Sequence, residues 1–298
     1  MSYPKKLLWA LAALLVCATA CARPLVVGAI SGKPTGEIAR FHPLAEHLAR
    51  GLGEFGIDRG KVVVVGSVRE LAELMKSGGA DLMFDSPYPT LAVGELSGSR
   101  VLLRRWKGGK QSYRSLVLVR ADSPVASAKD LRGKVIAFED GYSTSGYFLP
   151  VASLQGLGLK LREIPDPRAR VKGDEIGYVF SEGYGNSLTW LAHGRADAAG
   201  VGEHEYERFA QRDSGRMRIV LETPLVPRNL VGVRGDLAPA LVARIRQLLI
   251  ALEHTHEGKL LLESLDRTTR FDALPPDAEQ ALESIRRLLK QSGSAATR

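Results

Sequence analysis

The sequence predicts an α/β protein of two lobes with a ligand cleft between them. Two observations carry this prediction: short apolar runs alternate with helical periods, and this pattern restarts after Arg104. Alternating strands and helices are typical of a mostly parallel sheet covered by helices, so a restart indicates a second such unit. The 298 residues suffice for two domains, and a cleft between two lobes is a common place for a ligand.

The first block runs from a strand at Leu25–Ile30 to a strand at Ala80–Asp85. Between them, apolar residues recur at spacings of three and four, as on one face of an amphipathic helix: Phe41, Leu44, Leu48, Leu52 and Phe55. Lys61–Val65 is strand-like and Val68–Met75 is helical. Strand, helix and strand with short connections indicate a βαβ arrangement.

The second block is predicted to begin with a strand at Ser115–Arg120. Its further elements are a short helix, five strands and two longer helices, in chain order Ser127–Leu131, Lys134–Glu139, a helix from about Thr144, Glu175–Phe180, a helix near Asn186–His193, Asp197–Val201, Arg216–Leu221 and Asn229–Val233. From Leu237 onward we expect only helix, in two amphipathic segments, Ala238–Leu265 and Pro276–Lys290. The prolines of Pro165–Arg170 and Pro224–Pro227 predict loops.

These patterns predict the domain boundaries. Residues 1–22 form a signal peptide, 23–114 the first part of lobe 1, 115–228 lobe 2, 229–290 the return to lobe 1 with C-terminal helices, and 291–298 a frayed tail.

The N-terminus has the order of an export signal. Lys5 and Lys6 precede ten apolar residues, Leu7–Val16, and small residues follow up to Ala22. Cleavage after Ala22 would release a soluble periplasmic protein, and the alternative is a lipoprotein anchored through Cys21. No later segment approaches the roughly 20 apolar residues of a transmembrane helix.

Composition excludes several classes of protein. Hydrophobic residues make up 45% and charged residues 25%, as in globular proteins, which argues against disorder, collagen and coiled coil. The two cysteines, Cys17 and Cys21, lie in the predicted signal, so the folded body has no disulfide framework and no cysteine-rich zinc site. The formal charge is +8, or about +6 without Lys5 and Lys6 of the predicted signal, which suits an anionic ligand but equally suits no particular partner. Nucleic acid is not an expected partner, because no basic run is interleaved with aromatic residues.

The segment most informative about function is Lys134–Pro150. Its apolar strand runs into Ser143, Thr144, Ser145 and Gly146, where a helix is expected to begin. A helix N-terminus exposes unpaired N–H groups and a partial positive charge, and three hydroxyls beside it supply further donors. These features suit an oxyanion, and an ordinary Ser/Thr helix cap is the alternative.

The sequence resembles the periplasmic solute-binding proteins of phosphonate, phosphite and phosphate ABC transporters, the PhnD-like family. The run SLVLVRADSPVASAKDLRGKVIAFEDGYSTSGYFLP is similar to that family's strand, Ser-x-x-DL-x-GK turn and STSGY box, and GADLMFDSPYPTLAV resembles its earlier binding loop. The resemblance covers residues 24–255. It implies a type II periplasmic-binding-protein fold, in which two lobes with mixed sheets close around the ligand about a double-strand hinge.

The resemblance also implies the ligand-binding residues. Two loops would donate to the ligand from opposite lobes through hydroxyl-bearing side chains, Ser86 and Tyr88 on one and Ser143, Thr144 and Ser145 on the other. Tyr113, just before a strand near the first crossover, is a further candidate to line the cleft. A packing or surface role for Tyr113 stays open.

The second-lobe wall departs from the family pattern. Aligned on His193–Asp197, the family's Gly-Ser-His-Asp box reads Gly183–Asn186, so its histidine falls on Gly185 and its acid on Asn186.

The family's later ligand-binding aspartate falls near Gly202. The resemblance implies that a carboxylate there accepts a proton from a protonated phosphonate or phosphite. Glu203 and Tyr184 are therefore candidate replacements, and the identity of the oxyanion stays open.

Other charged residues have simpler interpretations. Arg104–Lys107 is expected to form a solvated face. His254 and His256 are not expected to bind a metal together, because residues i and i+2 of a helix point about 200° apart. Asp85 and Asp140 flank the two binding loops and are expected to cap them.

The leading hypothesis is therefore an exported, monomeric binding protein with no catalytic residues, cofactor or metal. It would capture a small oxyanion between its lobes and deliver it to a membrane ABC permease. The alternative is a ligand sensor of the same fold that signals to a membrane histidine kinase. A hydrolase is excluded, because no nucleophile, histidine and acid fall at corresponding strand ends and no G-x-S-x-G motif occurs.

Overall fold

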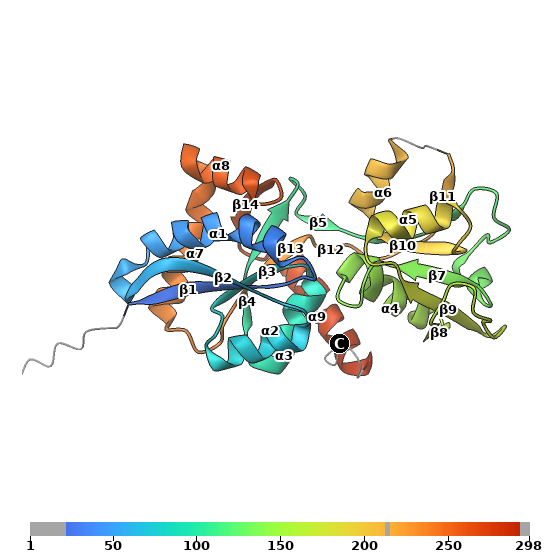
Figure 1. Cartoon of the computed structure of the whole chain (residues 1–298), viewed down its shortest axis with the longest axis horizontal. Coiled ribbons are helices and arrows are strands. Elements are labelled where there is room, and N and C mark those ends of the chain that lie inside the picture. Colours follow the sequence, from blue (N-terminus) through green and yellow to red (C-terminus); the bar gives the residue numbers. More distant parts are fainter. Residues whose placement is uncertain (1–21, 212–214, 293–298) are drawn as a thin grey trace, which may run out of the picture.

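The computed structural model describes residues 22–211 and 215–292, which form two lobes (Figure 1). Residues 1–21 of the predicted signal, with Cys17 and Cys21, and residues 293–298 of the predicted tail lie outside the described residues. In the described ranges, none of the helices has the length and apolar composition needed to cross a membrane.

The first lobe contains a six-stranded mixed sheet. β1 pairs in parallel with β2 and β3, and the other strands continue the sheet in antiparallel pairs. In spatial order the strands are β14 (Thr268–Asp272), β4 (Arg100–Lys107), β13 (Asn229–Val233), β3 (Leu82–Asp85), β1 (Arg23–Ile30) and β2 (Ile57–Val65). The sheet therefore combines the N-terminal part of the chain with its C-terminal part.

Helices cover both faces of this sheet because successive side chains of β1 point to opposite sides. Leu25 and Val27 lie in a core with Phe41, Leu44 and Leu48, which confirms the predicted apolar face up to that point, whereas Leu52 and Phe55 pack on the core from beyond the end of the helix at Arg50. The helices on that face are α1 (Pro34–Arg50), α7 (Pro239–Ala251) and α8 (His256–Ser264). Those on the other face are α2 (Val68–Ser77), α3 (Pro87–Ser97) and α9 (Pro276–Ser292) (Figure 1).

The second lobe contains another six-stranded sheet, in which β8, β9, β7 and β10 are parallel and β6 and β11 are antiparallel neighbours. In spatial order the strands are β11 (Met217–Glu222), β6 (Ser115–Arg120), β10 (Ala198–Gly202), β7 (Val135–Phe138), β9 (Glu175–Phe180) and β8 (Lys160–Glu163). Its helices are α4 (Leu149–Gly156) on one face and α5 (Tyr184–Ala192) and α6 (Glu203–Ala210) on the other.

Two short strands lie between the lobes, where the chain crosses from one sheet to the other. β5 (Ser112–Tyr113) and β12 (Val226–Pro227) form an antiparallel pair, visible between the two sheets in Figure 1. An apolar cluster also crosses the boundary, since Phe148 and Leu149 of the second lobe pack with Tyr88 of the first. The two lobes are therefore in direct contact in this structure.

The prediction of an entirely helical C-terminal region was wrong. The segment Ala238–Leu265 is interrupted by a 3-10 turn at Leu252–His254, and β14 follows it at the edge of the first sheet. Strand β4, Arg100–Lys107, was also missed. Both strands carry polar and charged side chains, so they lack the apolar run on which strand prediction depends.

The interpretation of Arg104–Lys107 as a solvated face was wrong for Arg104 and Arg105. The strand β4 lies inside the sheet between β13 and β14, and its residues Leu103, Arg104 and Arg105 are buried. Arg104 makes two hydrogen bonds to the Asp272 carboxylate, at 3.0 and 2.7 Å. Arg105 is 1% exposed and donates to Thr268, Asn229, the Leu265 carbonyl and Asp266.

Candidate functional site

Thr144 connects the two lobes through its hydroxyl group. Its Oγ1 accepts a hydrogen bond from the backbone N–H of Tyr88 at 2.9 Å and donates one to Ser86 Oγ at 2.9 Å. The Ser86 hydroxyl donates in turn to Asp85 Oδ1 at 3.1 Å. These hydrogen bonds form a directed chain, in which each group donates to the next. The chain runs from the Tyr88 N–H in the first turn of α3, through Thr144 of the second lobe, back to Asp85 at the end of β3.

The local sequence explains why these groups meet. Ser86 is the N-cap residue of α3 and Pro87 begins that helix, so the N–H of Tyr88 lies in the first turn and has no partner within the helix. Thr144 begins a π-helical turn, Thr144–Phe148, directly after the loop that follows β7. The Tyr88 ring stacks on Phe148 at 4.4 Å between ring centroids, which holds the two helix starts together.

Ser143 is used differently from Thr144. Its Oγ accepts the N–H of Gly146 at 2.9 Å and donates to Glu139 Oε2 at 2.7 Å, which is a helix cap. A Cβ on Gly146 would lie 2.5 Å from Glu139 Cβ, so glycine is needed for the close approach of this turn to Glu139. The hydrogen bonds of Ser143 are therefore those of an ordinary helix cap, which is the alternative to oxyanion binding that the sequence left open.

Tyr113 lies on the hinge strand β5, buried beside the hydroxyl-bearing turn. The guanidinium of Arg228 lies over its ring, 4.4 Å from the centroid. Burial raises the pKa of Tyr113 to about 12, although Arg228 and hydrogen bonds to Thr144 and Ser145 act in the opposite direction. The phenol is therefore a neutral hydrogen-bond donor at physiological pH.

Two acids of helix α6 lie near the position where the family aspartate was expected. Glu203 Oε1 lies 3.4 Å from Arg114 Nε. Glu205 Oε1 lies 3.5 Å from a terminal nitrogen of Arg228, and Oε2 is buried with no hydrogen-bond partner in the described part of the chain. The Glu205 carboxylate therefore lies with the Tyr113 and Arg228 group.

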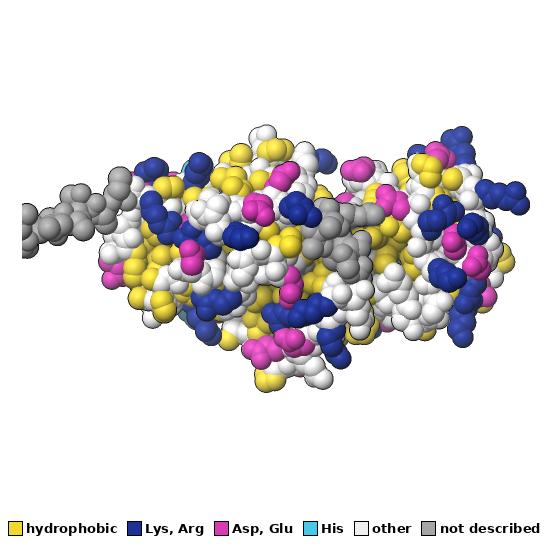
Figure 2. Space-filling model, turned by 90° about the horizontal axis from the view of Figure 1, so that it is seen from below, with side chains coloured by type: hydrophobic (Ala, Val, Ile, Leu, Met, Phe, Trp, Pro, Cys, Tyr) yellow, Lys and Arg dark blue, Asp and Glu magenta, His cyan; other side chains and the backbone are white. Residues whose placement is uncertain are grey.

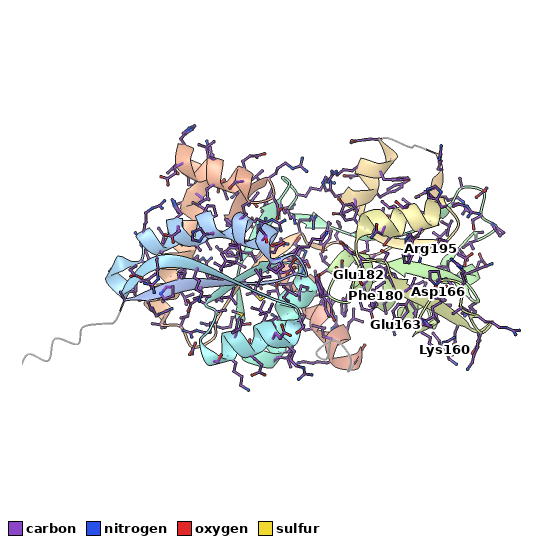
Figure 3. All side chains as sticks on the ribbon, viewed as in Figure 1. Lys160, Glu163, Asp166, Phe180, Glu182 and Arg195 are labelled. Atoms are coloured by element: carbon purple, nitrogen blue, oxygen red, sulfur yellow. The ribbon has the colours of Figure 1, made fainter. Side chains whose placement is uncertain are left out.

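The structure does not place every predicted site residue beside Thr144 and Tyr113. Tyr184 begins α5 and its side chain is 37% exposed. Asn186 turns back into its own loop and donates to the Ser181 carbonyl at 2.6 Å. Figure 3 shows Glu182, in the loop after β9, on the side of the second lobe nearer the first, and Lys160 farther out at the β8 edge.

Three carboxyl groups flank the junction of the lobes. Burial raises the pKa of Asp85 to about 6, and burial with the nearby Glu139 raises that of Asp140 to about 7. The pKa of Glu139 is also raised by burial. Asp85 and Asp140 accept the backbone N–H groups of Ser86 and Tyr142 within their loops, whereas the N-cap residues of the helices that follow are Ser86 and Ser143.

Charged groups on the molecular surface do not concentrate near one site on the face seen in Figure 2. Lys and Arg side chains are dispersed there among acidic and neutral ones over both lobes.

Sequence reasoning missed Glu205 and Arg228. The sequence did contain a signal for Glu205. An acidic residue three positions after the N-cap residue of a helix, here Gly202, can fold back toward that N-cap residue. Arg228 had no comparable signal, since it reaches Tyr113 only through the pairing of β5 with β12.

The comparison with known families identifies the class of protein. Residues 28–278 match the family model described as ABC transporter, phosphonate, periplasmic substrate-binding protein. The chain belongs to this family. Members of this phosphonate-binding family are substrate-binding components of transporters and not enzymes, so the comparison does not favour the sensing alternative.

Individual relatives agree with this assignment. The chain is 23% identical over 235 residues to the phosphate-import protein PhnD of Mycolicibacterium smegmatis, covering 75% of this chain and 70% of the relative. It is similar to the structure of XAC2383 from Xanthomonas citri bound to ATP, with 25% identity, a TM-score of 0.85, and 91% of this chain and 98% of that chain covered.

A third similarity is to PhnD1 from Prochlorococcus marinus (MIT 9301) in complex with methylphosphonate. Identity is 17% and the TM-score is 0.67, over 90% of this chain and 98% of that chain. The family match and these structures confirm the type II periplasmic-binding-protein fold predicted from the sequence.

Proposed function

We propose that this chain captures a small oxyanion of the phosphonate, phosphite or phosphate class between its lobes and delivers it to an ABC permease. The observation that carries the proposal is the gathering of neutral donors from both lobes at one buried junction. Ser86 and the Tyr88 N–H come from the first lobe, Thr144 and Ser145 from the second, and Tyr113 from the hinge. Several neutral donors can hold an oxyanion without a salt bridge.

The geometry indicates how binding would join the lobes. In the structure, the Tyr88 N–H and the Thr144 and Ser86 hydroxyls bond to one another. An oxyanion inserted among them would accept hydrogen bonds from these same groups, so the ligand would take over the connection between the lobes. The hinge pair β5 and β12 would allow the small rotation that admits it.

The proposed place of action is the periplasm, where the chain would act as a soluble monomer released from its signal peptide after Ala22. The mass of the protein recovered from the periplasm tests this. A chain that starts at Arg23 is expected, and a diacylated Cys21 or an intact Met1 would contradict the soluble form.

A thermal-shift screen of the mature protein tests the ligand class. We expect phosphate, phosphite or methylphosphonate to raise the melting temperature, because a ligand at 100 times its Kd stabilises the fold by about 2.7 kcal/mol. Arsenite, sulfate and selenate are the comparison anions. If no member of the phosphorus class stabilises the protein at millimolar concentration, the proposed function is wrong.

A further inference from the structure

A tight turn of the first lobe carries Lys110 to the boundary between the lobes. Lys107, at the end of β4, is joined to Lys110 by a backbone bridge, and the Lys110 N–H donates to the Lys107 carbonyl at 3.3 Å. Gly108 and Gly109 between them have φ of 63° and 74°, because a two-residue hairpin turn of this kind needs left-handed backbone at both positions. The Gly108 N–H donates to the Arg267 carbonyl at 2.9 Å, so the turn is fixed to the first lobe beside β14.

The Lys110 side chain reaches helix α6 of the second lobe. Its Nζ donates to both carboxylate oxygens of Glu207, at 2.8 Å to Oε1 and 2.7 Å to Oε2. Helix α6 is fixed to the second lobe, because Tyr206 and Phe209 pack against the core between this helix and the strands β6 and β10. The ion pair of Lys110 and Glu207 therefore joins the two lobes directly.

The Glu207 carboxylate is charged in this contact. The hydrogen bond from Lys110 is the largest influence on Glu207 and holds the pKa of its carboxyl below its usual range. Its Oε2 also lies 3.6 Å from Nδ1 of His204, one turn earlier on α6. The pair is therefore fully ionised at neutral pH.

We propose that Lys110 and Glu207 form an electrostatic clasp that stabilises the conformation in which the two lobes are in contact. The two side chains are carried by different lobes, so rotation about the hinge pair β5 and β12 changes their separation. Contacts of 2.7 and 2.8 Å are already at the favoured hydrogen-bond distance, and rotation in either direction weakens them. The clasp goes beyond the proposed function, because it acts on the lobes whether or not an anion is present.

The clasp should be weak and sensitive to salt. The two side chains are 35% and 45% exposed, and exposed ion pairs contribute little. Removing the pair should therefore change the ratio of contacting to separated lobes by about 1.5- to 5-fold. Salt screens exposed charges, since the Debye length falls from about 10 Å at 0.1 M to about 3 Å at 1 M. The clasp would therefore adjust the opening of the lobes rather than prevent it.

Titration calorimetry with phosphate and methylphosphonate is the first test, and this test rests on the proposed function. If the ligand-free lobes are mainly separated, Lys110→Gln and Glu207→Gln should each weaken binding by about 1.5- to 5-fold. A general effect of charge on the anion would instead have opposite signs, because one variant removes a positive charge and the other a negative one. The matched control is Lys160→Gln, an exposed lysine paired at 3.6 Å with Asp174 of its own lobe, which should keep the wild-type affinity.

The second test needs no ligand. Both cysteines of the sequence lie in the predicted signal, so Glu73→Cys on α2 and Lys129→Cys in the second lobe, both exposed, can be spin-labelled selectively. If the ligand-free lobes are mainly in contact, double electron–electron resonance should show more of a second label distance in Lys110→Gln and in Glu207→Gln than in the wild type. The reversed pair Lys110→Glu/Glu207→Lys should restore the wild-type distances, and about 1 M salt should remove the differences.

The outcomes distinguish the two proposals. If neither anion binds to the wild type, the proposed function is wrong, and the label distances alone decide the clasp. If both single variants keep the affinity and the label distances of the wild type, the clasp is wrong while the proposed function stands. Affinity changes of opposite sign in the two variants, or no restoration by the reversed pair, would also overturn the clasp.

Discussion

Neighbouring hydroxyls in the loop after β7 have different roles because their surroundings differ. Ser143 accepts a hydrogen bond from the Gly146 N–H and donates one to Glu139, so its hydroxyl acts as acceptor and as donor within the second lobe. Thr144 bonds instead to Ser86 and to the Tyr88 N–H of the first lobe. Of these two residues, Thr144 makes the hydrogen bonds between the lobes.

Replacing Thr144 and Ser145 together by alanine should remove two donors to the bound oxyanion. At about 1.5–3 kcal/mol for each hydrogen bond to a charged group, affinity should fall between about 10²-fold and 10⁴-fold. The Ser143 cap stays in place, so the ligand-free double variant should remain folded. Titration calorimetry measures the affinity, and thermal melting measures the stability.

The control for this double variant is Ser127→Ala. The Ser127 hydroxyl donates to Asp130 at a separate exposed turn of the second lobe, and its loss should cost about 1 kcal/mol of stability with affinity unchanged. If binding in the double variant stays within about threefold of wild type, which is only about 0.7 kcal/mol, the hydroxyls do not hold the ligand.

The buried carboxyl group of Asp140 should make stability depend on pH. Burial, then Glu139, raises its pKa to about 7, above the value of 3.8 expected when unfolded. The folded protein therefore binds more protons between about pH 4 and pH 7, and the free energy of unfolding falls as pH rises through this window. Asp140→Asn keeps the acceptor for the Tyr142 N–H and removes the charge. It should flatten this slope and stabilise the protein at pH 7.5 by at least about 1 kcal/mol.

Chemical denaturation between pH 4 and pH 8 checks the expected slope. The matched control is Asp122→Asn, an exposed aspartate of the same lobe paired with Arg120, for which a change below about 0.5 kcal/mol is expected. A slope that is identical in wild type and Asp140→Asn would show that Asp140 titrates normally.

At the scale of elements, the edge strand β14 depends on buried charge. Its pairing with β4 is reinforced by Arg104 bonded to Asp272 and by Arg105 bonded to Thr268 and Asp266. Removing one partner of a buried ion pair leaves an uncompensated charge in the core, so the Arg105 side chain and its partners stabilise this pairing together.

Removing the Arg105 side chain should therefore be strongly destabilising. Arg105→Ala removes the donor to Thr268, Asn229 and the Leu265 carbonyl, although Asp266 keeps Arg40 and Lys107, and the free energy of unfolding should fall by about 3–5 kcal/mol. Urea denaturation measures this loss. Arg59→Ala, at an exposed pair with Asp58, should change stability by less than about 0.5 kcal/mol, and equal losses in both variants would refute the role of burial.

How well the sequence predicts an element depends on whether that element has a local apolar pattern or depends on contacts between distant residues. β1 and α1 were predicted correctly because their apolar residues repeat with the strand and helix periods and lie in the core. β4 and β14 were missed because their apolar runs are short: the buried Leu103 and Phe271 stand among polar residues that find their partners only in the folded sheet. The turn at Thr144 was predicted as a candidate site from a local strand–loop–helix pattern, whereas Glu205 and Arg228 come near it only through the folded crossover between the lobes.

At the scale of the whole molecule, the two lobes should close on the ligand. The structure shows them in contact through Thr144 and through the stacked Tyr88 and Phe148, with β5 and β12 as the connection. We expect the radius of gyration, measured by small-angle scattering, to be smaller with a saturating phosphorus oxyanion than without it. The Thr144→Ala/Ser145→Ala variant at the same anion concentration should show no change. An unchanged radius in the wild type would contradict closure about this hinge.

The directed chain from the Tyr88 N–H through Thr144 and Ser86 to Asp85 has a consequence for release. If the anion departs while the lobes are still closed, the Tyr88 N–H can return to Thr144 and Thr144 to Ser86 across the lobes, and Ser86 to Asp85 within the first lobe, so unloading leaves none of the three without an acceptor. In the proposed delivery to a permease, these three donors would exchange the anion for partners within the protein. The same arrangement that makes the anion compete for its donors would also ease its escape.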